Sequence, residues 1–159
     1  MTSDEHTTSL GMLLGNMHAL EIRIRGFLSS LPGAQKVHDI HGVDLLSLPV
    51  GTELPESNIT NYDYLSTLVT KFNELATIDK TPLIDENVVN LRNTLMHGCV
   101  FARAASHQLH ILKFSKPVGG KCKIETSEDM TVEWFSRGQR ATMEAIRVVA
   151  KKMDPAATL

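Results

Sequence analysis

The chain has 159 residues and a formal net charge of −2, with 42% hydrophobic and 21% charged residues. These values are typical of one globular domain, so a disordered chain is not expected, and the small net charge argues against a general nucleic-acid coat. Aromatic residues make up only 5%, so a core would be mainly aliphatic, which favours helices over a sheet sandwich. We expect residues 1–159 to form a single domain.

The cysteines and the first residues indicate the cellular compartment. Cys99 and Cys122 are the only cysteines, and neither lies in a CxxC pair, so no zinc-ribbon or redox motif is present. The stretch MTSDEHTTSL is polar and acidic, unlike the basic start of a signal peptide. No apolar run approaches the ~18 residues that span a membrane. We therefore expect a cytoplasmic protein that needs no membrane, metal or cofactor.

The first predicted helix spans residues 8–31, because its apolar residues recur at three- and four-residue spacing. Thr7 or Thr8 is expected to cap it, and Pro32 and Gly33 end it. The expected inward residues are Leu10, Leu13, Leu14, Met17, Leu20, Ile24, Phe27 and Leu28.

Two further features belong to this first part of the chain. Glu21 and Arg25 are four residues apart, which is a favourable spacing for an ion pair on a helix. Residues 32–59 contain three prolines and three glycines, which predicts an irregular connection with a short helical turn at 34–40. A loop of this length in a small domain is often functional. Equally, the stretch VDLLSLPV is apolar enough to pack against the domain.

The rest of the chain predicts three more helices and one hairpin. Helices are expected at 61–78, with Thr60 or Asn61 as its cap, and at 85–104 and 131–153. The stretches 109–115 and 121–126 alternate apolar and polar residues around the turn PVGGK, which is typical of a β-hairpin. In the last helix the expected inward residues are Val132, Phe135, Met143, Ile146, Val149 and Ala150. The expected fold is therefore all-α, a four-helix up-and-down bundle with a small β-hairpin inserted before the last helix.

The predicted helix at 85–104 carries the polar stretch NLRNTLMHG. Asn93 and His97 are four residues apart and share a face, while Arg92 lies about 140° around the axis from His97. Gly98 is expected to leave room for another backbone or a phosphate. The apolar core stripe lies on a different face and consists of Val88, Leu91, Leu95 and Cys99.

These three residue types suit the cleavage of a phosphodiester without a metal. The imidazole of His97 can transfer a proton near neutral pH. The guanidinium of Arg92 can bind phosphate oxygens, and Asn93 can orient either side chain or a substrate hydroxyl. The alternative is structural: three polar residues near a helix end can simply cap it, pair with acids and face water.

The stretch LRNTLMHG, with Arg92, Asn93 and His97, resembles the signature of the HEPN family. The resemblance implies a HEPN-type helical bundle that forms a homodimer, with two copies of the motif helix facing each other across one cleft. It implies a metal-independent endoribonuclease with catalytic Arg92, Asn93 and His97, RNA as substrate, and a role in toxin–antitoxin systems, phage defence or RNA processing, with an antitoxin or another protein as partner.

Two alternatives to an active ribonuclease remain. Some HEPN proteins are catalytically inactive dimerisation modules that bind a partner protein or a nucleotide, and fold alone does not separate them from enzymes. A plain helical adaptor outside the family is the third reading. The segments 32–59 and 109–126 are not explained by the family pattern.

Other charged and histidine residues are weaker candidates. His38 with His41, and His107 with His110, are three apart and could bind a metal, but no ligand partner stands at suitable spacing, so surface positions are expected. Residues 103–152 hold 10 Lys and Arg against 5 Asp and Glu, which permits a basic surface. For the basic residues of the last helix we favour an ordinary solvated face over an RNA-binding strip: Arg137, Arg140, Arg147, Lys151 and Lys152.

Overall fold

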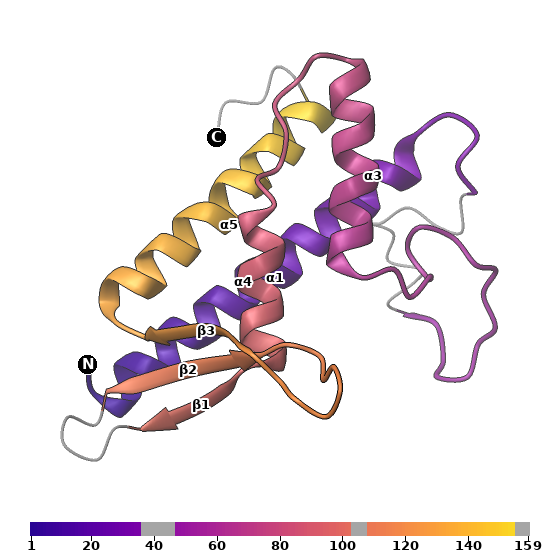
Figure 1. Cartoon of the computed structure of the whole chain (residues 1–159). Helices are drawn as coiled ribbons and strands as arrows, with labels where there is room; N and C mark the ends of the chain where they lie inside the picture. The colour runs from indigo at the N-terminus through magenta and orange to yellow at the C-terminus, as the bar shows by residue number, and fades with distance from the viewer. Residues whose placement is uncertain (36–46, 103–107, 155–159) are drawn as a thin grey trace. The chain divides into compact units, whose positions relative to one another are not determined.

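Figure 1 shows a computed structural model of the chain, which describes residues 1–35, 47–102 and 108–154. Within these residues the chain forms four helices and one three-stranded antiparallel sheet. The elements are α1 (Ser3–Ser30), α3 (Leu65–Ile78), α4 (Asn87–His97), β1 (Cys99–Ala102), β2 (Leu109–Phe114), β3 (Ile124–Asp129) and α5 (Val132–Met153). The prediction of an all-α bundle is wrong, because the fold mixes helices with a sheet.

Strand β1 accounts for most of this correction. The helix predicted to reach residue 104 ends at His97, and Gly98 has the extended backbone of a strand (φ −81°, ψ 155°). β1 then pairs antiparallel with β2, with Val100 opposite Ile111. The sequence CVFA is a four-residue apolar run, and periodicity cannot separate helix from strand over so short a run. Cys99 consequently lies exposed on β1 and not in the helix core stripe.

The hairpin prediction is confirmed, although its second strand lies later than expected. β2 pairs antiparallel with β3, with Leu112 opposite Ser127, and the register shifts between Lys113 and Phe114. The second strand occupies 124–129 and not 121–126, because Val118 and Lys121 form a bridge that closes the turn first. Gly119 and Gly120 stand inside that turn with φ 57° and 74°, a region that glycine adopts at little cost.

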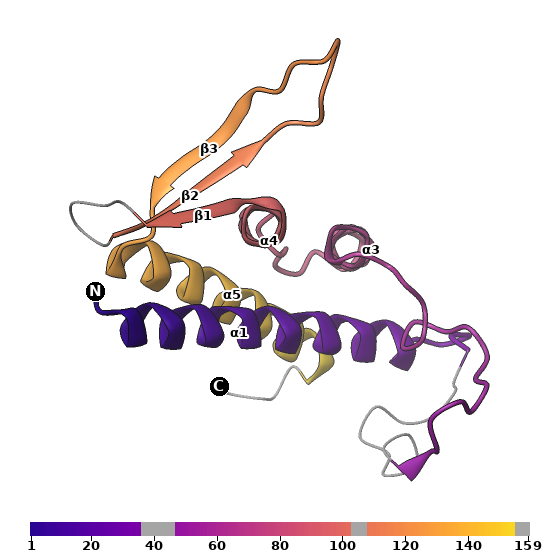
Figure 2. The ribbon, with the colours of Figure 1, turned by 90° about the horizontal axis from the view of Figure 1, so that it is seen from below.

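The chain divides into two units, residues 1–17 with 85–144 and residues 18–84 with 145–159. In the first unit α4 contacts β2, and Figure 2 shows α4 almost end-on beside the strands. A Cβ at Gly138 would lie 2.9 Å from Leu91 Cδ2 and 3.2 Å from Leu13 Cδ2, so glycine permits close packing there. The core of this unit comprises Leu13, Met17, Ile111, Met130, Trp134 and Phe135.

The second unit buries the remaining aliphatic face of α1 against α3. The rings of Phe27 and Phe72 meet edge to face with centroids 5.2 Å apart. Lys152 pairs with the carboxylate of Asp79 within the same unit. Other buried residues of the unit include Leu20, Ile24, Leu28, Leu65, Leu68, Val69, Val149 and Ala150.

Helix α1 begins earlier than predicted because a capping box precedes its first turn. The backbone N–H of Glu5 donates to Thr2 Oγ1 at 3.2 Å, and the N–H of Thr2 donates to Glu5 Oε2 at 2.7 Å. This reciprocal pattern satisfies two backbone donors that the helix itself leaves unpaired. The hydroxyl of Thr7, expected as a cap, instead donates to the Ser3 carbonyl inside the helix.

The other boundaries differ by smaller amounts. α3 starts at Leu65 rather than 61, and α5 matches the predicted 131–153 within one residue. In α5 the side chains of Val132 and Met143 are 55% and 38% exposed, so the prediction that they face inward is wrong. The predicted turn at 34–40 falls largely outside the described residues. No helix in the described ranges is both long and apolar enough to cross a bilayer.

Candidate functional site

The end of α4 determines where His97 lies. A Cβ at Gly98 would stand 2.4 Å from the Thr94 carbonyl oxygen and 2.9 Å from Ile111 Cγ1. Only glycine therefore lets the chain leave the helix and run beside β2. The space at Gly98 is filled by Thr94 and Ile111, so the expectation that it accommodates a phosphate is wrong. His97 becomes the last residue of α4, at its exposed end.

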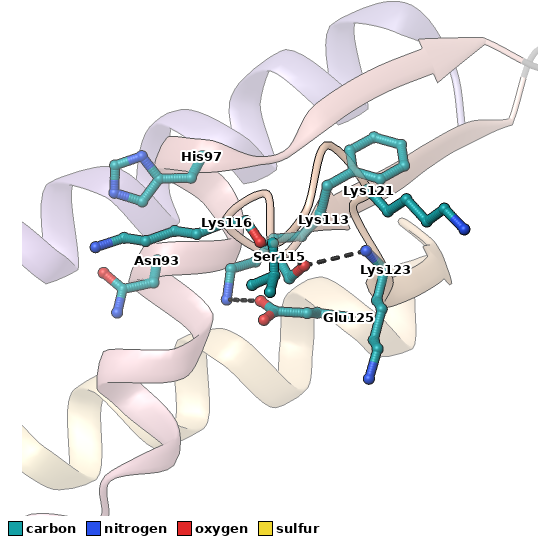
Figure 3. A pocket seen from close by; sticks show the side chains of 10 residues that line it. Asn93, His97, Lys113, Ser115, Lys116, Lys121, Lys123 and Glu125 are labelled. Carbon is teal, nitrogen blue, oxygen red and sulfur yellow. Dashed lines mark hydrogen bonds and ion pairs between the residues drawn. The ribbon is translucent and has the colours of Figure 1, made fainter.

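Asn93 and His97 line one cavity of about 1080 Å³. They lie one helical turn apart on the same face of α4, as their spacing predicts. The opposite wall comes from the end of β2, the turn that leads to β3 and the start of β3, as Figure 3 shows. Its residues are Lys113, Phe114, Ser115, Lys116, Val118, Lys121, Lys123 and Glu125.

The cavity wall carries four lysines and one carboxylate. Glu125 Oε2 pairs with Lys113 Nζ at 3.0 Å, so this carboxylate offsets that lysine. In Figure 3 the side chain of Lys116 extends toward Asn93 and His97, whereas Lys121 points away from α4. The cavity is therefore positively charged, and Lys116 is the lysine that extends toward His97.

A hydroxyl holds the turn that carries these lysines. The backbone N–H of Lys123 donates to Ser115 Oγ at 3.0 Å, and the N–H of Ser115 donates to the Lys123 carbonyl at 2.8 Å. The two bonds join the strands just beyond the register shift. The lysines are thus presented on a closed turn and not on a loose loop, which reduces the entropy lost when a ligand binds.

Arg92 is not among the residues that line this cavity. Its side chain is partly buried, and Nη1 lies 3.4 Å from Asn93 Oδ1, which is at the long limit for a hydrogen bond. The structure thus brings Asn93 and His97 together and leaves Arg92 beside them. Sequence reasoning missed the lysines of the turn, although the positive balance of residues 103–152 was a signal for them.

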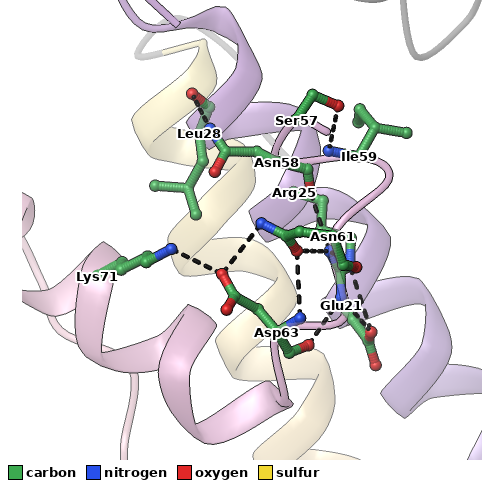
Figure 4. Close-up of polar contacts among 9 residues, drawn as sticks. All are labelled: Glu21, Arg25, Leu28, Ser57, Asn58, Ile59, Asn61, Asp63 and Lys71. Atoms are coloured by element: carbon green, nitrogen blue, oxygen red, sulfur yellow. Dashed lines mark hydrogen bonds and ion pairs between the residues drawn. The ribbon is translucent and has the colours of Figure 1, made fainter. Parts of the chain in front are cut away.

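A second polar cluster surrounds Arg25 in the other unit, as Figure 4 shows. Arg25 is only 6% exposed, and its Nη2 donates to Glu21 Oε1 at 3.1 Å, which confirms the predicted pair. Its guanidinium also donates to the carbonyls of Asn58 at 2.9 Å and Asp63 at 2.7 Å, and to Asn61 Oδ1 at 2.7 Å. Such a fully paired cation anchors the loop before α3 and leaves little capacity for a substrate.

A third cluster lies on the sheet. His110 Nδ1 is 2.6 Å from Asp129 Oδ1, and its Nε2 is 3.0 Å from Ser127 Oγ. The order of groups is that of a nucleophile, a base and an acid. However, none of the three residues lines the cavity of Figure 3, and His110 and Asp129 are direct cross-strand partners. We assign this cluster to strand pairing.

Among the remaining charged candidates, Arg137 is paired and three histidines lie outside the described residues. Arg137 Nη2 pairs with Glu128 Oε2 at 2.8 Å. Of the four histidines weighed and set aside as metal ligands, three fall outside the described ranges, namely His38, His41 and His107. Within those ranges no group of three or more His, Cys, Asp or Glu side chains is placed to hold a metal ion.

Comparison of the chain with protein-family models, with curated proteins and with solved structures finds no match. The function is therefore argued from the cavity at the end of α4, its charge, and the chemistry of the side chains that line it.

Proposed function

We propose that this protein is a HEPN-type endoribonuclease that cuts RNA without a metal, with Arg92, Asn93 and His97 as its catalytic residues. One observation carries the proposal: Asn93 and His97 share a cavity with a lysine-rich turn. An imidazole beside several ammonium groups suits a substrate that is a polyanion and needs a proton moved.

The proposed reaction uses the 2′-hydroxyl of RNA as nucleophile. Its oxygen loses a proton and bonds to the adjacent phosphorus, while the bond to the 5′-oxygen breaks and that oxygen gains a proton. The products carry a 2′,3′-cyclic phosphate and a 5′-hydroxyl. His97 transfers one of these protons, and Lys116 and Arg92 stabilise charge on the phosphate oxygens. Arg92 must swing from Asn93 toward the cavity to do so, which its long side chain permits.

The proposal includes a homodimer in which two α4 helices face each other. The second His97 would then supply the other proton transfer. Exposed apolar side chains of α4 and β1 support this arrangement: Met96, next to His97 in the chain, is 55% exposed and Phe101 on β1 is 52% exposed, and such side chains gain from burial in an interface. Sedimentation at micromolar concentration should show a dimer, and a monomer would remove the shared cleft.

A second candidate function is a catalytically inactive HEPN-like module that binds a nucleotide or a partner protein. The position of Arg92 outside the cavity lining favours it, because a phosphate bound near His97 would lack its strongest clamp. In either case the proposed setting is a toxin–antitoxin, phage-defence or RNA-processing system with an antitoxin or other protein partner.

Cleavage of single-stranded RNA in the presence of EDTA separates the two functions. The purified protein should cut a labelled oligonucleotide, and the 5′ product should end in a 2′,3′-cyclic phosphate. The same oligonucleotide with a 2′-deoxyribose at the cut site should stay intact, because it lacks the nucleophile. Strict dependence on a divalent ion would contradict the mechanism, and binding without cleavage would favour the inactive module.

A further inference from the structure

Phe114 lines the same cavity as His97, although regular strand geometry would direct its side chain elsewhere. Successive side chains of a strand point to opposite faces of the sheet, yet Lys113 and Phe114 both line this cavity. The register between β2 and β3 shifts between these two residues, and such an irregularity can redirect a side chain. The shift therefore brings a phenyl ring and an ammonium group to one wall of the site.

The apolar side chains of this wall are accessible to a ligand. Phe114 is 44% exposed, and Val118, in the turn beyond it, is 80% exposed. The other side chains that line the cavity are all polar or charged. A flat apolar surface inside a charged cavity suits a ligand that is itself both ionic and aromatic.

The cavity is larger than a single phosphate group requires, and its cations are spread out. Its volume of about 1080 Å³ is at the upper end of the range for sites that hold whole small molecules. Of its four lysines, only Lys113 forms an ion pair within the described part of the chain. Lys116 extends toward His97, whereas Lys121 points away from α4, as Figure 3 shows. Cations spread in this way fit a chain of phosphates better than one phosphate.

Single-stranded RNA combines both features, because its phosphates are charged and its unpaired bases expose flat aromatic faces. We propose that the site binds single-stranded RNA with one base stacked on Phe114, beside the phosphate that Lys116 and His97 contact. Lys121 and Lys123 contact phosphates further along the strand. This inference rests on the proposed ribonuclease function and adds to it how the substrate is held. Stacking accepts every base, so little sequence preference is expected.

Two strands that cannot be cut test this proposal on the whole protein. One is a single-stranded heptamer of uridines whose 2′-hydroxyls are replaced by fluorine, so that the nucleophile is missing. The other has the same number of phosphates but no bases. We expect the wild type to bind the uridine strand about 5- to 150-fold more tightly, which is the range for one base stacked on an aromatic side chain. Fluorescence anisotropy of end-labelled strands measures both affinities.

Three variants locate the effect. In Phe114→Ala the preference for the uridine strand should fall close to 1, because the ring is gone. Tyr62→Ala is the matched control: its side chain is 98% exposed and does not line the cavity, so the wild-type preference should remain. Lys123→Gln should weaken the binding of both strands by the same factor, because it removes a contact to phosphate and none to a base.

Equal binding of the two strands by the wild type, or binding of neither, would overturn the proposal, and neither result needs a variant to fold. A preference that survives Phe114→Ala would overturn it as well, because the base would then lie elsewhere. Cleavage of unmodified RNA is measured separately. Cleavage without a preference for bases would contradict only the stacking, and a preference without cleavage would contradict only the catalysis.

Discussion

Arg25 and Arg92 both stand next to asparagines, yet the two regions differ in what surrounds the guanidinium. Arg25 is buried and donates to one carboxylate, one amide oxygen and several loop carbonyls. Arg92 is partly exposed and, among the described residues, has a single long contact to Asn93. The first arrangement uses the whole donor capacity of the side chain, and the second leaves most of it for a ligand.

Burial and pairing distinguish a polar residue that stabilises the fold from one that is available to a ligand better than residue type does. A buried polar group that is fully paired stabilises one loop conformation, and removing it leaves several acceptors without donors. An exposed polar group beside a charged cavity contributes little to folding and can act on a substrate. The comparison predicts that substitutions in the two regions will affect different measurements.

The largest expected effect is on the rate of RNA cleavage. His97→Ala removes the proposed proton-transfer group, so the rate should fall about 10²–10⁴-fold. The free energy of unfolding should change by no more than about 0.5 kcal/mol, because the side chain is exposed. Single-turnover cleavage and urea denaturation measure the two quantities.

His18→Ala is the matched control for that experiment, since His18 is also exposed and on a helix. It should keep both the wild-type rate and the wild-type stability. If His97→Ala cleaves as fast as His18→Ala, then the end of α4 is not the site of chemistry.

The next largest effect is on stability and concerns the two arginines directly. Arg25→Met should lower the free energy of unfolding by about 3–5 kcal/mol, because it leaves the buried partners of Arg25 without their donor. Arg92→Met should change it by about 0.5 kcal/mol or less, but should slow cleavage about 10²–10³-fold. Equal loss of stability in both variants would remove the distinction drawn between the regions.

The smallest effect concerns His6, which is buried like Arg25, but whose two ring nitrogens have no hydrogen-bond partner among the described residues. Its pKa lies below the ordinary value of 6.5 because burial disfavours the charged ring. Below pH 6.5 the unfolded chain therefore takes up a proton that the folded chain does not, so His6 lowers stability as the pH falls.

His6→Phe should remove the fall in stability at low pH. It should also remove the cost of burying two ring nitrogens without partners, which is about 1–3 kcal/mol. Urea denaturation should show that the variant is more stable than the wild type at both pH 7.5 and pH 5. The difference in free energy of unfolding between the two proteins should be larger at pH 5. A stability difference between variant and wild type that stays constant or decreases toward pH 5 would contradict a buried neutral imidazole.

Long amphipathic helices could be predicted from the sequence because their stripes repeat over many turns. The inward faces of α1 and the last half of α5 follow directly from that repeat. The turn PVGGK predicted the hairpin because glycine adopts its backbone angles at little cost. The spacing of Thr2 and Glu5 also indicates a capping box. The cap was nevertheless predicted at Thr7 or Thr8, because the periodic apolar residues begin only after them.

The candidate site could be predicted only in part. Asn93 and His97 share a face because they are four residues apart on one helix, so local geometry alone places them together. The lysines of the cavity wall are 16 or more positions further along the chain than His97, and they reach it through the pairing of β1 with β2. No local pattern contains that pairing, because strand partners are chosen by contacts distant in sequence.

The sequence by itself determined the helices, the hairpin and the face that Asn93 shares with His97, since each depends on neighbours within a few residues. Tertiary structure alone decided that α4 stops at His97, because Ile111 and the Thr94 carbonyl leave no room for a side chain at Gly98. It also decided which arginine has its N–H donors occupied. Arg25 donates to carbonyls of a loop more than 30 residues away, whereas Arg92 contacts only its neighbour Asn93 within the described chain. Burial and pairing are properties of the assembled fold, so two residues of the same type acquire different surroundings.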